Sequence, residues 1–259
     1  MRALQVIALA SFMLSCDATE TKDSCITKSP GLKTISYDGS TLQANTVALT
    51  IEGGSLENSQ AIADILSANN VNATFFLRGI DFAGNTDSAD SIFAQGHTIG
   101  NAAFSGINLD KVEAPVLEVR QTDYLIRSYI RSNEFYFLAP EGAFTERLAS
   151  YLNKAGLNKY TGPITYDHST YDLNCWEEGD SPNACADKIF AEIEQSGQGI
   201  VRISSGDSRS VELSQELLSL FTNGGYSFVE LNTATSISAA LAANGASSGE
   251  NTAVCNDYE

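Results

Sequence analysis

The chain has 259 residues, of which 43% are hydrophobic, and its formal net charge at pH 7 is −17. This length allows one large α/β domain or two small ones, and the apolar fraction is ordinary for a globular core. The negative charge argues against nucleic acid or an anionic membrane surface as a partner, because both would repel the chain. We interpret the acidic excess as a solvated surface.

Residues 1–15 combine one arginine with an apolar run that is too short to span a bilayer. This pattern is typical of a signal peptide and predicts an exported protein. The segment Met13-Leu-Ser-Cys16 resembles a bacterial lipoprotein processing site. Processing there would leave Cys16 as a lipidated N-terminus on a tether that extends to residue 43, in the cell envelope. We expect membrane attachment only through such a lipid, and simple secretion stays open.

Four cysteines remain beyond Cys16, namely Cys25, Cys175, Cys185 and Cys255. An even number in an exported chain indicates two disulfides among three possible pairings. We expect Cys175 to pair with Cys185, closing a short loop, and Cys25 with Cys255, joining the two termini. None of these cysteines has the spacing of a zinc site or a redox centre.

Taken in chain order, predicted strands alternate with predicted helices. The first strand, Thr46-Val-Ala-Leu-Thr-Ile-Glu-Gly-Gly-Ser55, runs into one carboxylate and two glycines, as a buried strand does when it delivers an acid to a site. Later strands are predicted at 72–79, just after Gly96, and at 135–138, 164–167, 200–203 and 227–231. Helices are predicted at 56–66, 87–95, 109–132 with a break at Pro115, 145–155, 183–196 and 211–221, followed by a short Ala-rich helix.

Seven such alternations predict a parallel arrangement with right-handed crossovers. An open sheet and a closed barrel satisfy the pattern equally, and in either case the strand ends face the site. The segment from 168 to 182 is predicted to be a long loop, and loops of that length are usually functional or disordered. A disulfide across it would indicate an ordered loop.

Six segments together carry a resemblance to a known family. They are Thr46-Val-Ala-Leu-Thr-Ile-Glu-Gly-Gly-Ser55, Asn72-Ala-Thr-Phe-Phe-Leu-Arg-Gly79, Gly96-His-Thr-Ile-Gly-Asn101, Phe137-Leu-Ala-Pro-Glu-Gly142, Tyr166-Asp-His-Ser-Thr-Tyr-Asp172 and Gly199-Ile-Val-Arg-Ile-Ser204. In order and spacing they resemble the NodB-type polysaccharide deacetylases, carbohydrate esterase family 4. The resemblance covers residues 44–235 as one domain, with 236–259 as an extension. It implies an irregular (β/α) barrel of about seven strands and a polysaccharide or oligosaccharide ligand.

The residues that carry the family's chemistry are changed here. Two adjacent aspartates of the first motif, a general base and a metal ligand, correspond to Glu52 and Gly53. Two metal-binding histidines correspond to Ala102 and Gly106, and the late general-acid histidine to Ser204. A divalent ion needs several converging N or O ligands and an open position for water. We therefore expect no metal ligands and no cofactor, and a zinc-like divalent ion only if the chain is an active deacetylase.

The third motif differs too, because Leu138 replaces its arginine and Glu141 its tyrosine. The resemblance still places Pro140 and Glu141 among candidate substrate-binding residues. Aromatic side chains in the loops of the mouth are further candidates, since their faces pack against sugar rings. These are Phe104, Tyr171 and Trp176, whereas Tyr136 and Tyr166 are better interpreted as core residues.

Glu52 and Asp172 are the candidate catalytic residues, the second by its match to the fourth motif's aspartate. Side chains alternate along a strand, so Arg202 points inward one layer below Ser204. A buried arginine needs a partner. We predict that Arg202 pairs with Glu52 or Asp172, plays a structural role at the site and fills the volume where the ion implied by the resemblance would sit.

The two histidines are His97 and His168. His97 matches a histidine of the family's Gly-His pair that precedes the metal ligands, and we interpret it as structural. His168 lies between Asp167 and Asp172, a set that can bind a metal, but adjacent residues on a strand point to opposite faces. We therefore do not assign His168 as a metal ligand.

Three functions are compatible with these residues. The first is an exported pseudoenzyme that binds a cell-envelope or extracellular glycan without hydrolysing it. The second is an active carbohydrate N- or O-deacetylase with Glu52 as general base. The third is a non-catalytic interaction module of the cell envelope.

Overall fold

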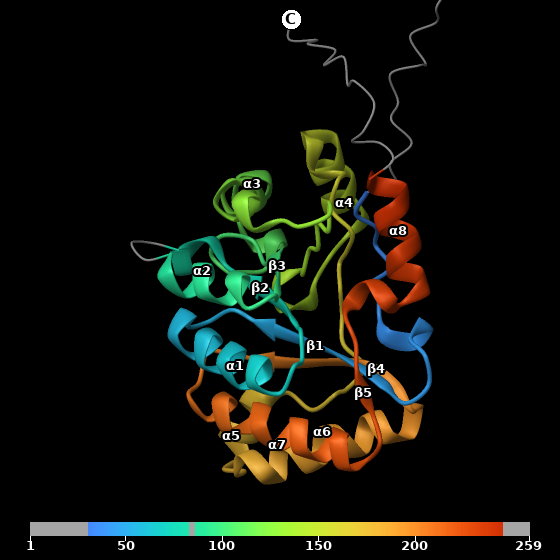
Figure 1. Cartoon of the computed structure of the whole chain (residues 1–259). Helices are drawn as coiled ribbons and strands as arrows, with labels where there is room; N and C mark the ends of the chain where they lie inside the picture. Colours follow the sequence, from blue (N-terminus) through green and yellow to red (C-terminus); the bar gives the residue numbers. More distant parts are fainter. Residues whose placement is uncertain (1–30, 83–85, 246–259) are drawn as a thin grey trace, which may run out of the picture.

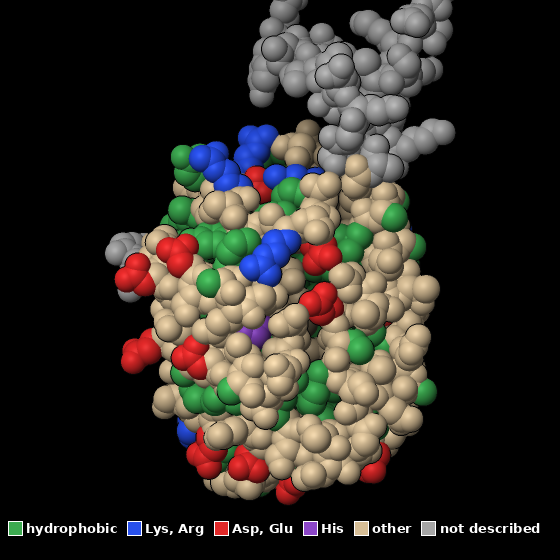
Figure 2. Space-filling view, viewed as in Figure 1, with side chains coloured by type: hydrophobic (Ala, Val, Ile, Leu, Met, Phe, Trp, Pro, Cys, Tyr) green, Lys and Arg blue, Asp and Glu red, His purple; other side chains and the backbone are tan. Residues whose placement is uncertain are grey.

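The computed structural model describes residues 31–82 and 86–245. The predicted signal peptide, the lipidation site at Cys16 and the pairing of Cys25 with Cys255 lie outside these residues. Within the described part of the chain, no helix is both long and apolar enough to cross a bilayer. Acidic side chains are scattered over the face seen in Figure 2, while Lys and Arg side chains gather towards its upper end.

A parallel sheet forms the centre of the fold (Figure 1). Its strands are β1 (Thr46–Glu52), β2 (Thr74–Leu77), β3 (Thr98–Asn101), β4 (Gln198–Ser204) and β5 (Ser227–Phe228). The order is β3-β2-β1-β4, and β5 pairs with the first two residues of β1. The five middle residues of β1 are buried, which explains its uninterrupted apolar and β-branched sequence. Because the strands are parallel, their carboxyl ends meet at one edge of the sheet.

Two predicted strands, at 135–138 and 164–167, form isolated bridges instead of regular ladders. Asn101 at the end of β3 bridges Phe137. The Ile164 N–H donates to the Phe137 carbonyl at 2.8 Å, and the Asp167 N–H donates to the Ile200 carbonyl of β4 at 2.9 Å. The hydrogen-bonded path thus returns from β3 to β4. Pro163, which has no N–H to donate, limits regular pairing in this segment. The predicted parallel α/β fold is confirmed, with fewer regular strands than the seven expected.

Eight α-helices flank the sheet in the described residues. They are α1 (Leu56–Ala68), α2 (Asp87–Ala94), α3 (Pro115–Ile126), α4 (Glu146–Leu152), α5 (Asp172–Glu178), α6 (Pro182–Ser196), α7 (Arg209–Asn223) and α8 (Thr235–Gly245). The Ser55 hydroxyl caps α1 by accepting from the Asn58 N–H. Helix α6 packs on α7 and α7 on α1, and α6 and α7 lie below β1 and β4 in the view of Figure 1.

The long helix predicted over 109–132 is wrong in its bounds. Helix α3 begins at Pro115 and ends at Ile126, with 3-10 turns at Leu109–Lys111 and Arg127–Tyr129. A proline at the first helical position loses no hydrogen bond, because that N–H would have no partner within the helix. Pro115 therefore starts the helix instead of breaking it.

The segment predicted as a long loop contains helix α5. Gly179 ends this helix in the left-handed conformation, at φ 83°. The predicted disulfide between Cys175 and Cys185 is confirmed, with 5.7 Å between the two Cα atoms. Both cysteines are buried in the main hydrophobic cluster, which also holds Trp176. The disulfide fixes α5 to α6, so this connection is ordered.

Candidate functional site

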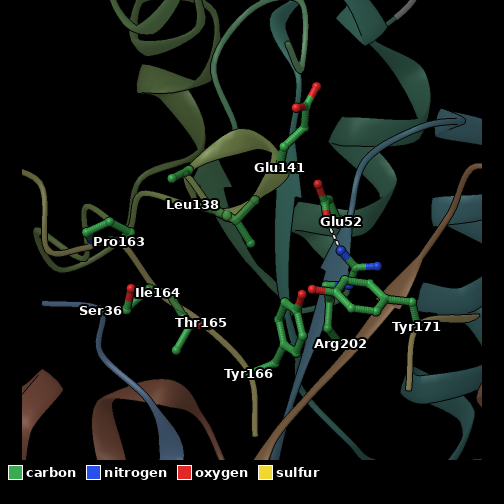
Figure 3. Close-up of a pocket in the computed structure, with 12 residues that line it drawn as sticks. Ser36, Glu52, Leu138, Glu141, Pro163, Ile164, Thr165, Tyr166, Tyr171 and Arg202 are labelled. Carbon is green, nitrogen blue, oxygen red and sulfur yellow. Dashed lines mark hydrogen bonds and ion pairs between the residues drawn. The ribbon is translucent and has the colours of Figure 1, made fainter. Parts of the chain in front are cut away.

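A cavity of about 300 Å³ opens beside Glu52, the last residue of β1 (Figure 3). In the parallel register, Glu52 lies beside Ser204 of β4, and Thr50 lies beside Arg202. The lining residues come from the ends of β1 and β4 and from the bridging segments: Ser36, Glu52, Leu138, Ala139, Glu141, Gly142, Pro163, Ile164, Thr165, Tyr166, Tyr171 and Arg202. The cavity therefore lies at the carboxyl edge of the sheet, as the parallel topology predicts.

The floor of the cavity holds Arg202 between two carboxylates. Its Nη1 lies 2.5 Å from Glu52 Oε2, and its Nη2 lies 3.5 Å from Asp172 Oδ1. Only 8% of Arg202 is exposed, and its Nε has no partner among the described residues. The predicted pairing is confirmed with both carboxylates. A buried guanidinium of this kind is stable only because the two negative charges compensate its lost hydration.

Asp172 is buried at the start of α5 and accepts from several donors. The Ser204 N–H donates to its Oδ2 at 2.7 Å, the Ser210 hydroxyl to the same oxygen at 3.3 Å, and the Leu173 N–H to Oδ1 at 3.0 Å. Burial raises the pKa of Asp172, and Arg202 and these hydrogen bonds oppose that effect. Asp172 therefore joins α5, β4 and α7, and its contacts are those of a positioning residue for Arg202.

His168 supports Arg202 from the backbone side. Its Nδ1 lies 2.8 Å from the Thr170 carbonyl and its Nε2 accepts from the Arg202 N–H at 3.0 Å, so the proton belongs on Nδ1. Burial lowers the pKa of His168 to about 4, which keeps the ring neutral. Asp167, its neighbour, accepts from the N–H groups of Gly39 and Ile200. Both ring nitrogens are occupied, and His168 has no lone pair for a metal.

Two tyrosines enclose the arginine from the cavity side. The rings of Tyr166 and Tyr171 meet edge to face at 5.5 Å, and Arg202 Cζ lies 4.9 and 5.0 Å from their centroids. Burial raises the pKa of Tyr166. Tyr171 is 39% exposed, and Figure 3 shows both hydroxyls near Arg202. Glu52 Oε1, the oxygen that does not bind Arg202, has no partner among the described residues and faces the cavity.

Glu141 forms part of the rim, in a turn where its φ is 56°. Lys111 lies 2.9 Å from its carboxylate and lowers the pKa of Glu141. Pro140, in the same turn, is buried and does not line the cavity. Leu138 presents an apolar wall in place of the family's arginine. Of the candidate substrate-binding residues, the structure brings Glu141 and Tyr171 to the cavity.

Phe104 and Trp176 lie elsewhere. Phe104 borders a separate shallow groove on α3 together with Leu117 and Tyr124. Trp176 is 8% exposed, packs in the main core, and has Arg209 over its ring at 4.6 Å. These placements favour structural roles for both rings.

His97 is fully buried, away from the cavity. Its Nδ1 accepts from the Ala73 N–H at 3.3 Å, and its Nε2 lies 3.2 Å from the Ala63 carbonyl. Burial lowers the pKa of His97. The neutral ring links α1 to the segment that enters β2, and its nitrogens are not available to a ligand.

The residues present do not fit a divalent metal at the strand ends. No group of three or more His, Cys, Asp or Glu side chains comes together within residues 31–82 and 86–245. A Cβ atom on Gly53 would lie 2.8 Å from Asp81 Oδ2, and one on Gly106 would lie 2.6 Å from Arg78 Cδ. Ala102 is buried and carries no donor. Side chains at positions 53 and 106 would thus meet the Arg78–Asp81 ion pair.

Four residues at or beside the site were not predicted from the sequence: Ser36, Thr165, Arg78 and Asp81. The first two belong to bridging segments with little periodicity, so no sequence pattern assigns them to the cavity. Arg78 follows the last residue of β2, and its position at a strand end is a signal that could have identified it. Tyr166, expected in the core, lines the cavity while packing against His168 at 5.1 Å.

Comparison with known proteins relates part of the chain to a known family. Residues 39–160 match the sequence model of the polysaccharide deacetylase family. Over these residues the chain is homologous to the NodB-type polysaccharide deacetylases. This deacetylase homologue is 26% identical, over 136 residues, to a chitin deacetylase of Arthroderma benhamiae; the match covers 49% of this chain and 37% of the relative. It therefore spans well under half of that enzyme's length.

Solved structures of similar proteins share the fold of the deacetylase homologue. The chitin deacetylase of Colletotrichum lindemuthianum is similar with a TM-score of 0.61 and 23% identity, covering 73% of this chain and 87% of that one. A wild-type CE4 family pseudoenzyme of Bacillus anthracis gives a TM-score of 0.61 at 21% identity, covering 74% and 66%. The NodB-like fold is thereby confirmed.

Proposed function

We propose that this deacetylase homologue binds a glycan in the Glu52 cavity and does not hydrolyse it by a metal-dependent route. The observation that carries the proposal is the Glu52–Arg202 ion pair at 2.5 Å. Glu52 is the only carboxylate at the two positions that correspond to the family's aspartate pair. One of its oxygens is thereby bound to the Arg202 guanidinium. The neighbouring position, Gly53, supplies no ligand atom from a side chain. A site with these atoms can hold a sugar more readily than it can activate water.

The shape and lining of the cavity suit a carbohydrate. A volume of about 300 Å³ lies at the small end for ligand pockets and suits about one sugar ring. The exposed face of Tyr171 can pack on the apolar side of that ring. Glu52 Oε1 can accept from a sugar hydroxyl, and Ser36 and Thr165 add hydroxyl groups to the wall. Because the relatives include chitin deacetylases, N-acetylglucosamine oligomers are the first probes to use.

An active deacetylase is the second candidate, favoured by the free Oε1 of Glu52 in the cavity. Hydrolysis of an amide also requires donors that stabilise the oxyanion in the transition state. The decisive comparison is deacetylation of chito-oligosaccharides with and without added zinc or cobalt, beside Glu52→Gln. We expect no metal-stimulated release of acetate. Turnover that rises with metal and disappears in Glu52→Gln would establish the enzyme instead.

Binding is tested separately by calorimetric titration of the full chain with the same oligosaccharides. We expect saturable binding with wild-type protein. The third candidate, an interaction module of the cell envelope, would be supported if the chain neither binds nor hydrolyses these oligosaccharides. It would also have to bind none of a wider set of envelope glycans on an array.

We also propose that the chain is exported and anchored by a lipid at Cys16. The buried Cys175–Cys185 disulfide supports an oxidising compartment. Expression with a labelled fatty acid tests the anchor, with Cys16→Ser as the control. Label in the wild-type chain that is lost in Cys16→Ser supports lipidation, whereas an unlabelled protein in the medium supports secretion.

A further inference from the structure

Arg78 is a fixed cation at the end of β2. Its Nη2 donates to Asp81 Oδ1 at 2.6 Å and its Nε to Asp81 Oδ2 at 3.1 Å. Nη2 also donates to the Gly54 carbonyl at 3.1 Å, in the loop after β1. The side chains of Asp81 and Arg78 are 8% and 28% exposed. Paired hydrogen bonds to one carboxylate and a further bond to the backbone hold the guanidinium in one orientation.

The Arg78–Asp81 pair fills the space in front of two glycines. A Cβ on Gly53 would lie 2.8 Å from Asp81 Oδ2, and a Cβ on Gly106 would lie 2.6 Å from Arg78 Cδ. Such contacts are closer than packed atoms tolerate, so any side chain at either position has to displace the pair. Gly106 also has φ 75°, which a residue with a side chain adopts at a cost.

The charges around the pair oppose a divalent cation. Both oxygens of Asp81 already accept from Arg78, and Glu52 Oε2 is bound to Arg202. The hydrogen bonds to Asp81 raise the pKa of Arg78, and the negative charge of Glu52 adds a smaller effect in the same direction. A guanidinium in this position repels a dication and occupies the acidic groups that could attract one.

We infer that the Arg78–Asp81 ion pair occupies the place of the metal implied by the family resemblance and excludes a divalent cation from it. Two of the positions at which the resemblance implies metal ligands, 53 and 106, face this pair directly. Restoring the ligands alone is then insufficient, and the pair has to be removed as well. This inference does not depend on glycan binding at the cavity.

Two variants of the full chain test the inference by zinc content. The first carries Gly53→Asp, Ala102→His and Gly106→His, and the second adds Arg78→Ala and Asp81→Ala. Each is equilibrated with zinc and dialysed, and the metal is measured by elemental analysis, alongside thermal unfolding with and without zinc. We expect no zinc above the wild-type level in the first variant. In the second we expect one ion per chain and a zinc-dependent rise in Tm. Zinc bound by the first variant, or a folded second variant without zinc, overturns the inference.

If the multiple variants do not fold, a smaller experiment tests whether Asp81 fills the space beside Gly53. Gly53→Ala is made in the wild-type chain and in Asp81→Ala, and the Tm of all four proteins is compared. We expect Gly53→Ala to lower the Tm clearly in the wild-type chain and much less once the Asp81 oxygen is gone. Equal losses in both backgrounds would show that Asp81 does not fill this space.

Discussion

Arg202 binds Glu52 across the β1–β4 strand pair, with 2.5 Å between Nη1 and Oε2. The two residues are not register partners, because Glu52 lies beside Ser204 and Arg202 lies beside Thr50. The arginine therefore reaches up one layer from inside the fold to the acid at the mouth. Asp172 holds the other side of the guanidinium, at 3.5 Å. An ion pair built into the floor of the cavity thus binds one of the two oxygens of the Glu52 carboxylate and leaves the other facing the cavity.

The first prediction concerns the loss of this cation. Arg202→Met removes the partner of two carboxylates, one of them, Asp172, fully buried. We expect the free energy of unfolding to fall by about 3–5 kcal/mol, because an unpaired buried charge remains. Urea unfolding followed by circular dichroism measures this change.

A matched control for Arg202→Met is Arg209→Met, which breaks the exposed Arg209–Asp207 pair. We expect little change in stability there, since exposed pairs contribute little. Adding Asp172→Asn to Arg202→Met should recover part of the lost stability. No recovery, or equal losses in the two arginine variants, would contradict the assigned role of Arg202.

The fold was predictable because its signals are local. The alternation of buried strands with amphipathic helices predicts the parallel arrangement, and the acid followed by glycines at the end of β1 predicts where the site lies. The alternation of side chains along β4 correctly predicted that Arg202 points inward. The sequence could not show which predicted strands pair regularly. In the segment from 161 to 167, Pro163 and isolated long-range bridges replace a regular ladder.

The candidate site was only partly predictable, for a related reason. A loop pattern without periodicity does not tell whether an aromatic ring faces a cavity or a core. Trp176 lies on the buried face of α5, a helix of seven residues that the sequence did not indicate, and Tyr171 just before it faces the cavity. The Arg78–Asp81 pair was not predicted because the space that it fills exists only where Gly53 and Gly106 lack side chains. These two glycines lie far apart in sequence.

The second prediction concerns pH. The buried ring of His168 has a pKa of about 4 against an ordinary value of 6.5. Between these values the unfolded chain binds a proton that the folded chain does not, so stability falls as the pH falls from 6.5 to 4. The contribution of this residue is about 3 kcal/mol over the full window.

Asp172 acts in the opposite direction, because its raised pKa makes the folded chain bind a proton that the unfolded chain has released. The contribution of His168 is therefore measured as the difference in stability loss between the wild-type chain and a His168 variant. Urea unfolding of the wild-type chain and of His168→Gln is followed from pH 7 to pH 4. We expect the wild-type chain to lose more stability than the variant as the pH falls. Parallel curves would mean that His168 is not held neutral.

The third prediction concerns the Cys175–Cys185 disulfide. It closes a segment with a sequence separation of 10. Restricting a loop of this length in the unfolded chain stabilises the fold by about 3 kcal/mol. We expect Cys175→Ala with Cys185→Ala to lower the free energy of unfolding by about that amount, measured in urea. Since α5 also carries Asp172, hydrogen exchange in α5 should increase more than in α1. A double variant as stable as the wild-type chain would show that packing alone holds α5.

The fourth prediction separates the two aromatic candidates for glycan binding. Tyr171 is 39% exposed at the cavity, whereas Trp176 is 8% exposed in the core. Tyr171→Ala removes the ring that can pack on a sugar, and we expect affinity for chito-oligosaccharides to fall about tenfold with little loss of stability. Trp176→Phe keeps most of the core packing and should leave affinity unchanged. Tyr151→Ala, at a tyrosine that is 59% exposed outside the cavity lining, is the matched surface control. Titration calorimetry on all three decides between the rings: weaker binding in Trp176→Phe with Tyr171→Ala unaffected would move the glycan site away from Glu52.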